Sequence, residues 1–530
     1  MACLPINYNV IYALTLVAFS SFRLYYQYMN KQFRMLLENI LGWAKRHFIL
    51  VLIITAVISM AISLSIGLRQ SVWFDEAYSI MLARQPLSQL MHLTSVDTHP
   101  PAYYLLLSGW GNLFGWGEFA LRSLSVLTMG GAIIFAGLLT RKMFGIRTAL
   151  YSLPFVMLAP FLLRYGFEIR MYSLASLIGI AATYVLICAI EAKDKRRLWL
   201  YVLYALLVAL GVYTLYYTVL LWAAHLTWLL WRNFSKKESV LKSDWAKAYL
   251  LSIVLFLPWM PTFVHQITNG ALAPISQSMT LDNFFGIISF SFLYRPVWQL
   301  DALLSLIILF VITMLGNVSV RAFKIADKKQ KPYLFLLALY ILVPVIALTL
   351  VGLVHPMYVE RYLAHVLIGA SLFIGVSLVL VMDKTKLFHK IYGLALIFVM
   401  VLGIVQLADV GNYNFQRLQH PAINQVADRI TTCDSNTAVY AADPYVAIEL
   451  SYYLPKCQIN FFSDTASLGG GYAGLSNSAL RIAKPAAELA TKRAIYYVYY
   501  GDAKLTMPAS FVSTKKETDG SLVVEYFRQN

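Results

Sequence analysis

Two adjacent carboxylates, Asp75 and Glu76, follow directly after the first long apolar run of the chain, within the segment Trp73–Tyr78. Carboxylates beside a bilayer are costly to desolvate unless they have a partner or a task. One interpretation is capping of a helix N-terminus, where acidic residues are favoured. The other is general-base catalysis, in which a carboxylate takes a proton from an acceptor hydroxyl or amine. We take Asp75 and Glu76 as candidate catalytic residues.

The same loop carries a second polar pair, Asp97 and His99, directly before Pro100 and Pro101. Because they share a loop with Asp75, we predict that Asp97 and His99 bind substrate. An Asp-x-His arrangement also offers ligands to a divalent metal, although two ligands fall short of a site. The sequence identifies no certain cofactor, and a divalent metal is the candidate. If a metal is used, its candidate ligands are Asp75, Asp97 and His99.

Arginine and tyrosine recur in two further short segments, the turn 164–172 and the start of a late apolar run at 360–362. Interfacial anchoring, with an internal Glu168–Arg170 pair, is one explanation. The other is phosphate binding, because a guanidinium grips phosphate through two parallel hydrogen bonds. The candidate substrate-binding residues in these segments are Arg164, Glu168, Arg170, Tyr172, Arg361 and Tyr362.

The elements that position these residues are apolar runs long enough to cross a bilayer. The chain is 59% hydrophobic and only 13% charged, with a mean hydropathy of +0.64, which exceeds what a water-soluble core can bury. We predict about eleven spanning helices from these runs. Their ranges are 48–68, 117–140, 148–164, 171–190, 198–213, 217–231, 246–262, 301–320, 332–353, 362–382 and 390–408.

The basic residues predict the orientation of these spans. The net charge of +17 does not indicate nucleic acid, because lysine and arginine lie in short loops between the apolar runs. One alternating set of loops is rich in both, and the positive-inside rule places it in the cytosol. An odd number of spans then leaves the C-terminus extracytoplasmic, in a multi-pass protein of the plasma (inner) membrane. The opposite loops contain only arginine, at Arg69, Arg84, Arg122, Arg164, Arg170, Arg295 and Arg361.

The composition divides the chain into three parts. Residues 1–47 precede the first clear span, and residues 9–22 form a marginal extra helix, a signal anchor or sequence upstream of the true start. Residues 48–410 form the membrane domain, whose first outer loop has the apolar spacing of an interfacial amphipathic helix. Residues 411–530 are polar and predict a small soluble α/β domain.

Short elements are also expected in this tail. Ala438–Ala441 and Ala494–Tyr500 predict strands, and Ala422–Thr431 predicts a helix. Cys433 and Cys457 lie together in the same polar segment, where an oxidising compartment would allow them to pair. We predict a Cys433–Cys457 disulfide.

The order of these motifs resembles bacterial GT-C-class glycosyltransferases, in particular the protein O-mannosyltransferase-like group that includes the lipid A aminoarabinose transferases. The resemblance covers residues 48–408. It rests on Asp-Glu after the first span, Asp-x-His-Pro-Pro-x-Tyr-Tyr in the same loop, Glu-x-Arg-Met-Tyr after the third span and a late Arg-Tyr-Leu. At Asp97 and His99 the chain departs from aminoarabinose transferases, which tend to carry Glu-Lys before a single proline.

The resemblance implies a GT-C membrane domain and a sugar transfer, usually with inversion, from a polyprenyl-phosphate-linked donor. The acceptor is a lipid, glycan or protein, and no nucleic acid takes part. It also implies that Asp75 acts on the acceptor, while Arg170 and Arg361 contact the donor phosphate. An arginine pair would stabilise the charge that develops on the leaving phosphate.

A transporter or flippase for lipid or polysaccharide is the main alternative, and a structural assembly protein is another. The sequence has no obvious repeat of its first half and no pair of Gly/Pro-broken spans, both of which mark many transporters. Its acids gather in outer loops and not at the bilayer midplane. An assembly protein would not explain why carboxylates and arginines share one face.

Overall fold

A computed structural model of the chain describes residues 31–268, 280, 285–286, 291–294, 302–353, 359–382, 387–410, 423–442, 444–462, 481–482, 489–501, 507–519 and 522–530. The marginal helix expected at 9–22 lies outside these residues. The described residues fall into two compact units that divide between Val51 and Leu52. The first contains α2, Lys31–Arg46, whose last turn carries Lys45 and Arg46. The predicted boundaries at residues 47 and 410 stay predictions.

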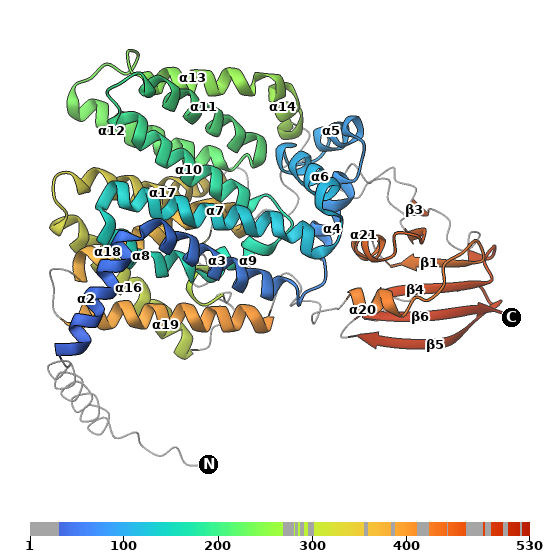
Figure 1. Cartoon of the computed structure of the whole chain (residues 1–530). Helices are drawn as coiled ribbons and strands as arrows, with labels where there is room; N and C mark the ends of the chain where they lie inside the picture. The colour runs from blue at the N-terminus through green and yellow to red at the C-terminus, as the bar shows by residue number, and fades with distance from the viewer. Residues whose placement is uncertain are drawn as a thin grey trace. The chain divides into compact units, whose positions relative to one another are not determined.

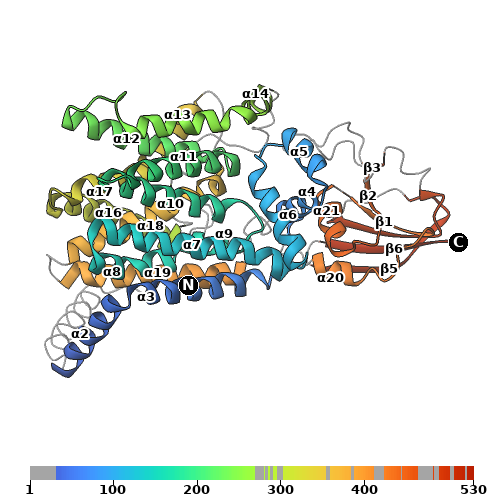
Figure 2. The ribbon, with the colours of Figure 1, turned by 45° about the horizontal axis from the view of Figure 1, so that its top comes forward.

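Long apolar helices make up most of the second unit. Figures 1 and 2 show α7, α10 and α18 lying side by side, and these helices pack against one another. The helices of this part are α3 (Phe48–Gly67), α7 (Glu118–Phe144), α8 (Ile146–Met157), α9 (Pro160–Phe167), α10 (Tyr172–Glu191), α11 (Arg196–Thr214), α12 (Thr218–Lys236), α13 (Asp244–Phe256), η1 (Leu257–Trp259), α14 (Met260–Thr268), α16 (Ala302–Ile325), α17 (Gln330–Gly352), η3 (Glu360–Leu363), α18 (Ala364–Met382) and α19 (Leu387–Val410).

Nine helices of the described residues are long and apolar enough to cross a membrane. The pair α8 and α9 would make a tenth span, bent by 64°. Pro160 begins α9, and a proline cannot continue a helix without losing a backbone hydrogen bond. The span predicted at 217–231 corresponds to α12, which is not among these helices and carries Arg232 and Lys236 near its end. The predicted polytopic helical fold is confirmed.

The first long loop, residues 68–117, forms three short helices. These are α4 (Phe74–Ala83), α5 (Leu87–Ser95) and α6 (Ala102–Phe114). The apolar spacing that predicted an amphipathic helix is divided between α4 and α5, because Pro86 separates them as the N-cap of α5. Pro101 is the N-cap of α6, as its missing N–H would allow at a helix start.

The C-terminal residues form a small α/β domain with a six-stranded sheet in the order β3-β2-β1-β4-β6-β5. Its elements are α20 (Ile423–Asp428), β1 (Thr437–Ala441), α21 (Pro444–Tyr453), β2 (Ile459–Phe462), β3 (Arg481–Ile482), β4 (Ala494–Tyr500), β5 (Phe511–Asp519) and β6 (Leu522–Gln529). Strands β3, β2, β1 and β4 pair in parallel, whereas β4 with β6 and β6 with β5 pair antiparallel. The predicted alternation of strand and helix therefore holds in β1-α21-β2. It gives way to a hairpin where only two residues separate β5 from β6, because so short a connection cannot cross over to a parallel strand.

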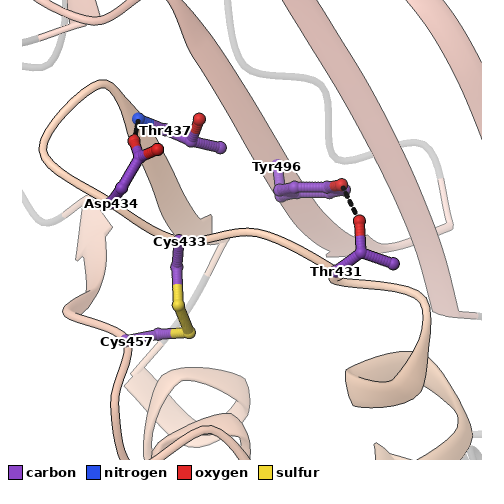
Figure 3. The surroundings of a disulfide bond; sticks show 6 residues. All are labelled: Thr431, Cys433, Asp434, Thr437, Cys457 and Tyr496. Atoms are coloured by element: carbon purple, nitrogen blue, oxygen red, sulfur yellow. Dashed lines mark hydrogen bonds between the residues drawn. A yellow bond between two sulfur atoms is a disulfide. The ribbon is translucent and has the colours of Figure 1, made fainter.

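Cys433 and Cys457 are joined by a disulfide, with their Cα atoms 5.4 Å apart (Figure 3). The bridge ties the segment before β1 to the turn that follows α21. Beside it, Asp434 accepts hydrogen bonds from the backbone N–H groups of Asn436 and Thr437 at 2.8 and 2.7 Å. The turn that follows α21 is therefore attached covalently to the segment that leads into β1.

Candidate active site

Helix α4 carries both candidate catalytic carboxylates at its N-terminal end. Asp75 and Glu76 lie in its first turn and are 2% and 1% exposed. The Glu76 side chain accepts a hydrogen bond from the backbone N–H of Trp73 at 3.3 Å, which satisfies one of the donors left over at a helix start. Glu76 therefore caps the N-terminus of α4, whereas the Asp75 side chain makes other contacts.

Glu76 is held from three directions. Besides the Trp73 N–H, its Oε2 accepts from Arg122 Nη2 at 3.1 Å, and its Oε1 accepts from the backbone N–H of Ile169 at 3.0 Å. Ile169 precedes Arg170, so this carboxylate joins the start of α4 to the turn 164–172. Both oxygens of Glu76 are engaged by the protein, which favours a positioning role.

Asp75 faces a second arginine. Its Oδ2 lies 3.6 Å from Arg361 Nη2, and Arg361 comes from η3, far along the chain. The guanidinium of Arg361 also lies near the rings of Trp73 and Tyr362, 5.9 and 5.7 Å from their centroids. The first loop and the start of the late span therefore meet at Asp75, as the predicted site requires.

Arg170 lies on the other side of this cluster. Its Nη1 donates to the hydroxyls of Ser79 and Tyr104 at 3.1 and 3.4 Å and lies 3.5 Å from the backbone oxygen of Asp75. Its Nη2 lies 3.4 Å from Nε2 of His99. Arg170 therefore connects α4, α6 and the Asp97–His99 segment.

The environment of His99 favours its neutral form. Burial lowers the pKa of His99, the positive charge of Arg170 lowers it further, and Asp97 opposes both effects. A neutral imidazole can accept a hydrogen bond at Nε2, which is the atom facing Arg170. Its Nδ1 lies 2.8 Å from the Thr98 hydroxyl and 3.7 Å from Asp97 Oδ2.

Asp97 is fully buried, yet within the described part of the chain neither of its carboxylate oxygens receives a hydrogen bond. Its nearest titratable neighbour is the imidazole of His99, 3.7 Å from Oδ2. A buried carboxylate normally has hydrogen-bond donors, because leaving it without them is costly. Asp97 thus has acceptor capacity that the described residues around it do not use.

Glu168 pairs with Arg164 and not with Arg170. Arg164 Nη1 lies 3.0 Å from Glu168 Oε2, while Trp73 Nε1 donates to Glu168 Oε1 at 3.1 Å. Burial raises the pKa of Glu168 to about 7, and the Arg164 charge opposes this rise. The Glu168–Arg170 pair considered from the sequence is wrong, because Arg164 lies one helical turn before Glu168 and reaches it along α9.

Two predicted tyrosines complete the cluster. The ring of Tyr362 lies 5.9 Å from that of His99 and 6.5 Å from that of Tyr172. Tyr172 is fully buried, and its hydroxyl has no hydrogen-bond partner among the described residues. All the predicted catalytic and substrate-binding residues therefore come together in one buried cluster, and their chemical roles stay predictions.

The structure adds residues to the cluster that the sequence did not single out for the site. Arg122 on α7 is fully buried and binds Glu76, and Ser79 and Tyr104 hold Arg170. An arginine inside an apolar helix was a signal for Arg122, because such a charge needs a partner. Ser79 offered no comparable signal.

The predicted metal ligands do not form a metal site by themselves. Over the residues with a described structure, no three His, Cys, Asp or Glu side chains group as metal ligands would. Asp97 and His99 are close, but Asp75 is paired with Arg361 instead.

Residues 98–262 match the family model described as dolichyl-phosphate-mannose-protein mannosyltransferase. None of the curated proteins matches the chain. Among solved structures, apo ArnT from Cupriavidus metallidurans is similar with a TM-score of 0.62 and 11% identity, over 91% of this chain and 98% of that chain. ArnT from the same organism bound to undecaprenyl phosphate is similar with a TM-score of 0.59 and 13% identity, over 90% and 98%.

The chain has the GT-C fold. The resemblance inferred from the sequence is thereby confirmed at the level of the fold. The GT-C fold extends well beyond the family-model match, which includes His99, Arg164 and Arg170 but not Asp75 or Arg361.

Proposed function

We propose that the chain transfers a sugar from a polyprenyl-phosphate-linked donor to an acceptor on the extracytoplasmic side of the plasma (inner) membrane. The observation that carries the proposal is the buried pair of Asp75 and Arg361, 3.6 Å apart, with Arg170 held against the same turn of α4. It places one carboxylate and two guanidinium groups where α4, η3 and the turn 164–172 meet. The lysine- and arginine-rich loops support the assignment of sides.

In this proposal Asp75 is the general base. An oxygen or nitrogen of the acceptor forms a bond to the anomeric carbon of the sugar, while the bond from that carbon to the phosphate oxygen breaks. The proton of the acceptor passes to Asp75, and the electron pair of the broken bond stays on the leaving lipid phosphate. Arg361 and Arg170 stabilise that charge, and attack from the side opposite the phosphate inverts the anomeric centre.

The Asp75–Arg361 contact suggests how the base becomes available. An arginine beside a carboxylate stabilises its charged form and so makes it a weaker base. A donor phosphate would compete for Arg361, because arginine binds phosphate through two parallel hydrogen bonds. Donor binding would then release Asp75 from its partner at the moment when the base is needed.

Glu76, Glu168 and Arg164 support this arrangement in our proposal. Glu76 fixes the start of α4 through Arg122 and Ile169, and Glu168 holds Trp73 against the site. Asp97 and His99 contact the substrates, with the unused oxygens of Asp97 accepting hydroxyl or amine protons of a sugar. The acceptor is a lipid, glycan or protein.

The test is transfer by the purified full chain in lipid nanodiscs, supplied with a panel of polyprenyl-phosphate sugars. Wild type should turn over at least one donor, and Asp75→Asn should lose about 10²–10⁴ of that rate, as expected for a removed general base. Asp194→Asn serves as the matched control, because Asp194 lies in an exposed ion pair with Arg196. Equal rates for Asp75→Asn and wild type would remove Asp75 from the mechanism. A folded wild type that turns over no donor would favour the transporter alternative.

A further inference from the structure

Helix α21 of the C-terminal domain packs directly on α4, the helix that carries Asp75. Figures 1 and 2 show the two helices next to each other. The ring of Tyr445, at the start of α21, meets the ring of Phe74 edge-on at 4.4 Å. Near its end, Tyr452 lies beside Arg84, the C-cap of α4, with the guanidinium 5.7 Å from the ring. Both ends of the Asp75 helix therefore touch the C-terminal domain.

The last residue of α21, Tyr453, makes the most specific of these contacts. Its hydroxyl accepts from the backbone N–H of Val72 at 2.7 Å and donates to Glu118 Oε1 at 2.7 Å. A phenol has one donor and spare acceptor capacity, so both roles are used at once. Val72 is fully buried and lies directly before the N-cap of α4, so no water can readily replace the phenol there.

A continuous set of contacts leads from Tyr453 to the site. Glu118 Oε2 pairs with Arg122 Nη1 at 3.0 Å, and Arg122 Nη2 donates to Glu76 Oε2 at 3.1 Å. Glu76 Oε1 accepts from the N–H of Ile169, the residue before Arg170. The Tyr453 hydroxyl thus stands at one end of a buried charged network whose other end fixes the turn 164–172.

We propose that Tyr453 is a positioning residue for the transfer reaction, through which the C-terminal domain sets the geometry of the first turn of α4 and so of Asp75. The proposal rests on the proposed function. Tyr453 touches neither Asp75 nor Arg361, and it acts through Val72 and the Glu118–Arg122–Glu76 network. The disulfide that follows α21 supports this role, because it fixes the end of α21 to its sheet.

The experiment compares Tyr453→Phe with Tyr452→Phe in the full chain in nanodiscs. Tyr453→Phe keeps the ring and removes only the hydroxyl. Tyr452 is its neighbour on the same helix, and among the described residues its hydroxyl donates to the backbone oxygen of Trp116 at 3.2 Å and to no side chain of the network. Both variants are measured for kcat, for donor KM and for hydrogen exchange of the amides at residues 72–78.

We expect Tyr453→Phe to lower kcat by about 10-fold with the donor KM changed less than about twofold, since small misplacements of a catalytic group are costly. Exchange at residues 72–78 should become faster, because the Val72 amide loses its partner. Tyr452→Phe should leave kcat and exchange near wild type. Equal kcat in Tyr453→Phe and wild type, or the same loss in both variants, would overturn the proposal.

Two further arms keep the proposal falsifiable. If Tyr453→Phe does not fold, Glu118→Gln interrupts the same network by weakening the pair with Arg122 and should give the same split between kcat and KM. If wild type transfers no sugar, the proposed function has failed. The exchange data then still decide the structural step, because unchanged protection at residues 72–78 in Tyr453→Phe would show that the hydroxyl does not hold α4.

Discussion

Two of the buried polar networks among the described residues differ in charge. Inside the helix bundle, His225 Nε2 lies 3.0 Å from the Thr183 hydroxyl, and its Nδ1 lies 3.0 Å from the Tyr204 hydroxyl. Tyr204 donates to Tyr249, which in turn donates to the backbone oxygen of Trp222. Thr183 also bonds to Tyr340. This network contains no carboxylate and no arginine, and each of its polar groups has a partner.

The network around Asp75 is different in both respects. It contains buried carboxylates and arginines, and Asp97 and the Tyr172 hydroxyl lack hydrogen bonds among the residues with a described structure. A satisfied neutral network rigidifies the helices that share it, whereas unused acceptors beside buried cations suit a ligand. This difference supports our proposal that the network around Asp75 carries the chemistry, whereas the network around His225 holds helices together.

Removal of Arg361 should have a large effect, second to that of Asp75→Asn, and it would be seen in donor use. If Arg361 binds the donor phosphate, Arg361→Ala should lower kcat/KM for the donor by on the order of 100-fold, as for other groups that stabilise developing charge. The acceptor KM should change little. Steady-state kinetics with the donor and the acceptor varied separately check this. Arg361→Lys is the matched variant, and an unchanged donor dependence in Arg361→Ala would contradict the phosphate role.

Glu168 should make the free energy of unfolding fall as the pH rises. Its pKa is raised from an ordinary value of 4.5 to about 7, so the folded state holds a proton there that the unfolded chain releases. Stability from this group is therefore full below about pH 4.5, declines as the pH rises toward 7, and levels off above it.

Glu168→Gln should remove this part of the pH dependence. Thermal unfolding in nanodiscs between pH 5 and 8 measures it, with Asp194→Asn as the exposed control. A curve for Glu168→Gln that falls with pH as steeply as that of wild type would show that another group is responsible.

Thr183→Val should have the smallest effect and no specific effect on chemistry. It removes hydrogen bonds to His225 and Tyr340 inside the bundle, and such bonds between membrane helices contribute on the order of 1 kcal/mol. We expect a slightly lower unfolding temperature and wild-type kcat and KM values. A loss of transfer comparable to that of Asp75→Asn would mean that the two networks are not separate in function.

Much of the fold could be predicted from the sequence because bilayer thickness dictates helix length. Ranges such as 48–68 and 171–190 agree closely with α3 and α10. The range 148–164 was predicted as a single span, and the break at Pro160 divides it between α8 and α9. Hydropathy averaged over a window of residues does not reveal a bend within a span.

The sequence predicted which residues lie together in the site, but not which of them form pairs. Acids and arginines in loops on one side of the membrane need partners of opposite charge, and in the structure they pair with one another. The partner of Glu76 could not be inferred, because Arg122 lies 46 residues away and belongs to an apolar helix. The role of Tyr453, which comes from another domain and carries no charge, left no sign in the sequence.

Arg122 also binds the backbone where α3 ends, because it donates hydrogen bonds to the oxygen of Gly67, the last residue of α3, and to the oxygens of Gln70 and Ser71 in the segment that follows. The last carbonyls of a helix have no partner within it, and a guanidinium carries enough donors to serve several of them together with two carboxylates. An ammonium group has fewer donors and no fork. The donors of Arg122 thus serve backbone oxygens as well as carboxylates, and an arginine in a predicted outer loop can have a structural role without contacting a substrate.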